Sequence, residues 1–165
     1  MADLHARAPQ PPEVRPKLRF FKVELAGMAL IALLPLAAIV GLFGPASAHA
    51  TGRVGELRIE AEYPERLRTA MAERISLELV NEGSRALSNV TVTLDPEFMY
   101  AFGEVAFTPE PARPYEIELA SLAPGGRERI EIEVHAAEYG LHEGHIRIGS
   151  DGDTGSLPVR TLIFP

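Results

Sequence analysis

The stretch from Val23 to Phe43 constrains this chain most. From Leu25 onward it contains no ionisable side chain, and nearly all of its residues are apolar. A helix needs about 20 such residues to cross about 30 Å of hydrocarbon. The sequence therefore predicts one transmembrane helix over residues 23–43. This helix divides the chain into a basic, proline-rich arm at 1–22, a linker of small residues at 44–53 and a domain at 54–165.

The same stretch can also be interpreted as a secretory signal. Ala46-Ser47-Ala48 and Ala48-His49-Ala50 both have the Ala-x-Ala form of a cleavage site. Signal cores usually contain about 7 to 15 apolar residues, however, and this stretch is longer. We therefore expect an uncleaved anchor. The alternative is cleavage near Ala48 or Ala50, which would release a secreted binding or adhesion module.

Basic residues next to the apolar stretch predict its orientation. Arg15, Lys17, Arg19 and Lys22 lie directly before it, and short basic flanks stay in the cytoplasm. We expect the amino terminus in the cytoplasm and the carboxyl-terminal domain outside it. The chain is then a single-pass protein of the bacterial cytoplasmic (inner) membrane, with its domain in the periplasm.

Three residues of this region are predicted to contact the bilayer or a partner in it. Phe20 and Phe21 are expected at the level of the lipid headgroups. Pro35 removes one backbone donor from the middle of the helix and can kink it. The predicted partners are therefore the lipid bilayer and integral membrane proteins of a larger complex.

Charge and composition exclude several classes of function. The whole chain has a net charge of -7, and residues 51–165 hold eleven basic against twenty acidic side chains. An acidic surface does not bind nucleic acid, which requires clustered Lys and Arg. Because the chain contains no cysteine, disulfides and cysteine-based metal sites are excluded. The exported domain must rely on its hydrophobic core, and about 115 residues suffice for one.

From Val54 onward the hydrophobic period changes from that of a helix to two. Apolar residues alternate with charged or hydroxyl residues in seven short segments, and turn-forming sequences separate several of them. The segments lie at residues 55–63, 75–79, 90–94, 115–119, 130–134, 146–148 and 157–164. Such strands have one apolar face each and are stable only when two sheets pack together. The predicted fold is all-β, a two-sheet sandwich of about seven strands after one transmembrane helix.

Several of these segments resemble bacterial immunoglobulin-like modules of the CARDB type. The run Ile75–Gly83 ends in Asn-x-Gly, the Val-rich run Leu87–Leu94 follows, and Leu119–Gly126 ends in a Leu-x-Pro-Gly turn before the alternating run Ile130–Val134. The resemblance covers residues 54–164. It implies an immunoglobulin-like sandwich used for adhesion, spacing or protein contact, and it brings no catalytic residues with it.

Residues 95–114 depart from this pattern because they form a long, aromatic connection. Phe98, Met99, Tyr100 and Phe102 place a large apolar area in five positions, and exposed aromatic clusters mark contact surfaces. We predict a partner-binding site there. The alternative is that Phe102, Val105 and Phe107 form a middle strand and cap the sandwich core. Both interpretations can hold together, with Tyr100 or Met99 left outside.

Histidines provide the candidate metal ligands. His142 and His145 flank a glycine, and imidazole suits copper or zinc. The spacing is not specific, and polar loop histidines are the favoured interpretation. The alternating carboxylates are expected on solvated sheet faces, since catalytic pairs require a converging, apolar pocket. No catalytic residue, cofactor or small-molecule substrate is expected.

Taken together, these patterns predict a non-catalytic accessory or structural subunit of a larger membrane complex, which braces or covers its extracytoplasmic face. A periplasmic factor that delivers or senses copper is an alternative, as is the secreted binding module.

Overall fold

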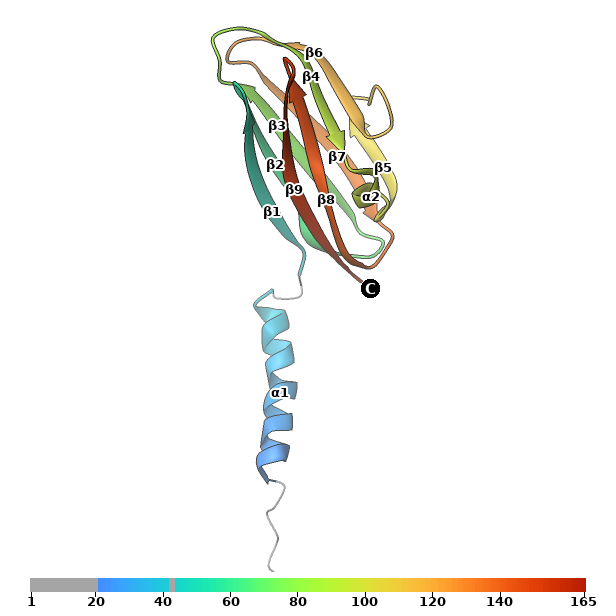
Figure 1. The fold of residues 1–165 in the computed structure, drawn as a ribbon. Helices are drawn as coiled ribbons and strands as arrows, with labels where there is room; N and C mark the ends of the chain where they lie inside the picture. The colour runs from blue at the N-terminus through green and yellow to red at the C-terminus, as the bar shows by residue number, and fades with distance from the viewer. Residues whose placement is uncertain (1–20, 42–43) are drawn as a thin grey trace, which may run out of the picture. The chain divides into compact units, whose positions relative to one another are not determined.

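The computed structural model describes residues 21–41 and 44–165, which divide into two compact units between residues 42 and 43. The first unit contains helix α1, Phe21–Ile39 (Figure 1). Its stretch Lys22–Ile39 has a mean hydropathy of 1.9 and is long and apolar enough to span a membrane. The predicted contact residue Phe20 and the rest of the arm at 1–20 lie outside the described residues, as does the side chain of Phe21.

The second unit is built of strands and one short helix. The sequence predicted about seven strands, and the structure contains nine in its described part. They are β1 (Ala46–Val54), β2 (Leu57–Arg68), β3 (Ala72–Asn81), β4 (Leu87–Leu94), β5 (Phe102–Thr108), β6 (Glu116–Leu122), β7 (Arg127–Ala136), β8 (Gly140–Ser150) and β9 (Asp153–Phe164), with helix α2 (Pro96–Met99) between β4 and β5.

The strands form two layers that one strand joins. The first layer has the order β5-β7-β3-β2 with β1 on the free side of β2, and the second has the order β9-β8-β4-β6. β2 belongs to both, because residues 57–62 pair with β3 and residues 66–68 pair in parallel with β9. The inward-facing apolar residues of all these strands make one continuous core. The predicted all-β, immunoglobulin-like sandwich is confirmed.

β1 occupies most of the segment that was predicted to be a linker. It pairs with β2 along its whole length, from Ala46 opposite Arg66 to Val54 opposite Leu57. The prediction of a linker at 44–53 was therefore wrong from Ala46 onward. Its inward residues are small because β1 lies close to β9: a side chain at Gly52 would meet Leu157 at 2.8 Å.

The aromatic connection contains two elements of its own. Asp95 caps α2 by accepting a hydrogen bond from the backbone N–H of Glu97 at 3.1 Å, which satisfies a free donor of the first turn. β5 then pairs with β7 and forms one edge of the first layer. Phe102, Val105 and Phe107 therefore belong to a strand, as the alternative interpretation proposed, but it is an edge strand and not a middle one.

Candidate functional site

Three of the four predicted partner-binding residues in the sandwich belong to its core. Phe98, Met99 and Phe102 are 2%, 0% and 5% exposed, and the rings of Phe98 and Phe102 meet edge to face at 5.6 Å. α2 presses Phe98 onto β8, where Gly144 has no side chain and leaves room for it. An exposed cluster of these aromatic residues does not exist, and this part of the prediction is corrected.

Tyr100 remains outside, and two residues that the sequence did not single out are exposed with it. Among the described residues of the sandwich, the exposed large apolar side chains are Tyr100 (71%), Tyr139 (72%) and Leu141 (59%). Tyr100 follows α2, Tyr139 lies between β7 and β8, and Leu141 is the second residue of β8. Tyr100 is distant in sequence from the other two, which flank Gly140.

Backbone hydrogen bonds bring these residues to one end of the sandwich. The carbonyl of Ala101 accepts bonds from the N–H groups of Ala137 and Glu138, so the neighbours of Tyr100 and Tyr139 are joined. Leu141 pairs with Leu162 on β9. Leu162 also pairs with Arg66 on β2, and Arg66 pairs with Ala46 at the start of β1.

We call this the entry end. It consists of the start of β1, the β2–β3 turn at 69–71, the α2–β5 connection at 100–101, the β7–β8 connection at 137–139 with the start of β8, and the end of β9. The N–H groups of Thr69 and Ala70 donate to Phe164 and Ala136, which ties these segments together. In Figure 1 the C-terminus and the start of β1 lie at this same end of the sandwich.

The two candidate histidines do not come together. Both lie in β8, where side chains three positions apart point to opposite faces of the sheet. His142 lies 3.0 Å from the carbonyl oxygen of Glu138 through Nε2, and His145 is exposed. In the described part of the chain no three His, Asp or Glu side chains gather closely enough to hold a metal ion.

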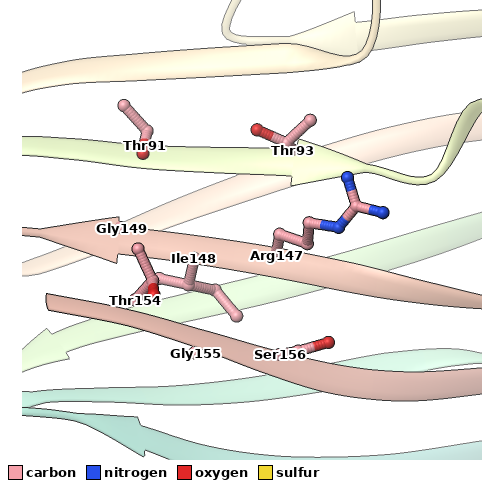
Figure 2. Close-up of a pocket in the computed structure, with 8 residues that line it drawn as sticks. All are labelled: Thr91, Thr93, Arg147, Ile148, Gly149, Thr154, Gly155 and Ser156. Atoms are coloured by element: carbon pink, nitrogen blue, oxygen red, sulfur yellow. The ribbon is translucent and has the colours of Figure 1, made fainter.

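The outer face of the second layer carries an open groove of about 570 Å³. Figure 2 shows its lining from β4, β8 and β9, with the side chain of Arg147 extending from the middle strand. In the strand register Arg147 lies between Thr93 and Ser156. We call this the Arg147 groove, and its lining residues are Thr91, Thr93, Arg147, Ile148, Gly149, Thr154, Gly155 and Ser156.

Glycine forms the floor of this groove. Gly149 lies between Thr91 and Thr154 in the strand register, and a side chain at this position would meet the Oγ1 atom of Thr91 at 2.6 Å. Because glycine leaves the space open, the flanking hydroxyl groups line a hollow instead of a filled sheet face. Hydroxyl groups donate and accept hydrogen bonds, so the hollow suits polar groups of a partner.

Arg147 differs from most other arginines of the sandwich in having no carboxylate partner among the described residues. Ion pairs with Asp or Glu are formed by Arg53, Arg58, Arg74, Arg85, Arg113, Arg127, Arg129 and Arg160. The nearest acidic residue across β4, Glu116, pairs with Arg113. Arg147 therefore presents an uncompensated positive charge on a domain whose overall charge is negative.

The sequence contained only weak signals for these surfaces. Arg147 stands between Ile146 and Ile148 in an alternating strand, as many solvated arginines do. Its lack of a partner depends on the register of β8 with its neighbour β9 and with β4, which is distant in sequence. Tyr139 and Leu141 flank a glycine after β7, and only the fold places them beside Tyr100.

Comparisons with known proteins give no family for this chain. No protein family matches the sequence, and no curated protein matches it. The resemblance to CARDB modules therefore stays a prediction.

Among solved structures, similar folds include a PapD-like domain of human CEP192, with 12% identity, coverage of 67% of this chain and 87% of that chain, and a TM-score of 0.42. The GAE domain of GGA2p from Saccharomyces cerevisiae has 13% identity, coverage of 71% and 96%, and a TM-score of 0.38.

Proposed function

We propose that this chain is a non-catalytic, membrane-anchored accessory subunit of a larger membrane complex, and that its sandwich braces or covers the complex outside the cytoplasm. The observation that supports the proposal most is the nature of α1. None of the stretch Lys22–Ile39 is buried, and all of its side chains after Glu24 are uncharged. Such a helix prefers a bilayer or the apolar helices of other membrane proteins.

The proposed topology follows from the flanking charges. The basic residues before α1 hold the amino terminus in the cytoplasm, and the sandwich lies on the periplasmic side of a bacterial inner membrane. A signal sequence near the amino terminus has the same length and hydropathy. The mature amino terminus separates these alternatives, because cleavage near Ala48 or Ala50 would remove α1 and the first residues of β1.

Within the membrane, α1 provides the lateral contact of this proposal. Pro35 lies inside the helix with its ring exposed, and it removes a hydrogen-bond donor from the backbone. A bend or a free carbonyl at this depth gives a partner helix a specific place to pack. Pro35 is therefore retained as a proposed contact residue.

Outside the membrane, the proposed contact is the Arg147 groove. When two proteins bind, an arginine that is unpaired in the free protein can lose its water and form an ion pair with a carboxylate of the partner. Such arginines are often among the few residues that provide most of the binding energy. The threonine and serine hydroxyls around it supply hydrogen bonds at the rim. The partner surface that fits is acidic and presents a carboxylate side chain or a carboxyl terminus.

Purification in mild detergent tests the proposal. The tagged full-length chain is expected to co-migrate with integral membrane proteins. Arg147→Gln is expected to weaken this association by about tenfold or more, because truncating an arginine at the centre of an interface costs about 1–2 kcal/mol or more. The amount of co-purified partner at equal bait concentration measures the effect.

Arg127→Gln is the matched control. Arg127 is also an exposed arginine on an outer sheet face, but it lies in the first layer and pairs with Glu78. Its replacement is expected to leave the amount of partner unchanged. A chain that migrates alone at every detergent strength would overturn the subunit proposal, and equal losses in both variants would overturn the assignment of the groove.

A further inference from the structure

The entry end differs from the opposite end of the sandwich in the chemistry of its turns. Residues 69–71 and 137–139 contain one ionisable side chain, Glu138. The turns at the opposite end contain four, namely Glu56, Glu82, Arg85 and Asp151, and Arg85 pairs with both Glu56 and Asp151 there. The turns of the entry end therefore carry fewer ionisable side chains than those of the opposite end.

The exposed large side chains of the sandwich lie at the entry end. Tyr100, Tyr139 and Leu141 each expose more than half of their surface. Tyrosine has an apolar ring and a hydroxyl group that seeks water, which makes it a preferred residue at membrane–water interfaces. The exposed Arg68, which has no carboxylate partner among the described residues, adds a cation at the end of β2.

The covalent chain limits how far this end can be from α1. α1 ends at Ile39 and β1 begins at Ala46, so the connection reaches at most about 25 Å when it is fully extended. This limit follows from chain length alone and holds for every orientation of the two units. For a membrane-spanning α1, this length limits how far the start of β1 can lie from the bilayer surface.

We propose that the entry end is a lipid-docking surface, and that Tyr100, Tyr139 and Leu141 insert into the headgroup region of the outer leaflet. The inference rests on the membrane span of the proposed function and adds a second, peripheral contact with the same bilayer. Because the anchor makes docking intramolecular, the local concentration of lipid is high and three side chains suffice. Docking sets the orientation of the sandwich. Leu141 and Arg147 lie on the same face of β8, and the Arg147 groove, which lies further along this strand, stays free for a protein partner.

Tryptophan fluorescence tests the docking directly, because the chain contains no tryptophan. Full-length chain with Tyr139→Trp is reconstituted into phosphatidylcholine vesicles without any other protein. Docking predicts emission at shorter wavelength than in water, and a loss of intensity when the vesicles contain brominated acyl chains. Tyr100→Trp is a second reporter with the same expected behaviour.

Ala86→Trp is the matched control, since Ala86 is exposed in the β3–β4 turn at the opposite end. Its emission is expected to stay at the wavelength of water-exposed tryptophan and to resist quenching by the brominated lipid. If both entry-end reporters behave like this control, docking is overturned. Shielding of the reporters only in membranes that contain a partner protein would overturn it as well, because pure lipid must suffice.

An alkaline wash of the same vesicles distinguishes a failure of the docking proposal from a failure of the membrane span. A chain that stays with the vesicles while its entry-end reporters remain in water keeps the span and loses only the docking. A chain that the wash extracts contradicts the span itself, and both proposals then fail together.

Discussion

Asn81 shows how one buried polar side chain fixes the junction of three segments. Its Nδ2 atom donates to the carbonyls of Arg85 at 2.7 Å and Leu122 at 2.9 Å, and its Oδ1 atom accepts from the N–H group of Gly83 at 2.9 Å. The side chain is fully buried. It satisfies backbone groups of the β3–β4 turn and the carbonyl of Leu122 in β6, with which its hydrogen bond is buried. The Asn-x-Gly sequence alone indicates only the contact with the turn.

Replacing this asparagine is expected to destabilise the sandwich. Asn81→Ala leaves the carbonyl of Leu122 and the turn groups without their partners, and we expect a loss of about 2–4 kcal/mol in the free energy of unfolding. Urea denaturation followed by circular dichroism measures it. Ser84→Ala, an exposed change in the same turn, is expected to stay within about 0.5 kcal/mol. Equal effects of the two changes would show that the side-chain hydrogen bonds of Asn81 are unimportant.

The sequence predicted the solvated positions of the glutamates but not the unpaired position of Arg147. The alternating glutamates were expected on solvated faces, and Glu78, for example, pairs with Arg127 and Arg129 across β3 and β7 on an outer face. Such exposed pairs contribute little stability. Arg147 has the same local sequence pattern, and only the register shows that it lacks a partner.

At the scale of elements, strands with large apolar residues could be predicted and strands with small ones could not. All seven alternating segments became strands, because Ile, Leu and Val at every second position mark a buried face. β1 was missed since its inward residues are alanine and glycine. Their size reflects the close approach of β1 to Leu157, which is a property of the fold and not of the segment.

The same reasoning explains why the aromatic segment was assigned to the surface. Phe98, Met99 and Phe102 follow a strand without alternation, so their sequence gave no inward face. Burial depends on α2, a helix of four residues that folds back over Gly144. Short helices have no detectable period, and the position of Gly144 becomes meaningful only when β8 is in place.

β1 offers a test of whether its small inward residues hold it to the core. Ala50 is partly buried against the core, and its neighbour Thr51 is exposed. Ala50→Asn places an amide without partners between the layers, and we expect a loss of about 1–3 kcal/mol. Thr51→Asn makes the same side chain on the outer face and is expected to be nearly neutral. Thermal unfolding measures both, and equal stability of the variants would mean that β1 contributes little to the sandwich.

For the whole molecule, the sequence predicted the division into an apolar helix and a β-domain because the two parts bury their apolar residues in different ways. After Glu24, α1 has uncharged, mostly apolar residues on all sides, as is typical of a helix that spans a bilayer. The sandwich has alternating faces and closes on itself. The boundary lies earlier than predicted, since α1 ends at Ile39 and the second unit begins before residue 54.

This division predicts that the sandwich folds without its anchor. Its core is built from residues of β1 to β9 and α2, and none of the described side chains of α1 belongs to it. A chain of residues 44–165 is therefore expected to be a soluble monomer with the same cooperative unfolding midpoint as the full-length chain in detergent. A chain of residues 55–165, which also lacks β1, is the comparison and is expected to unfold earlier because the layers lose one covered edge. Chemical denaturation and analytical ultracentrifugation measure both, and aggregation or non-cooperative unfolding of residues 44–165 would show that the domain depends on the helix.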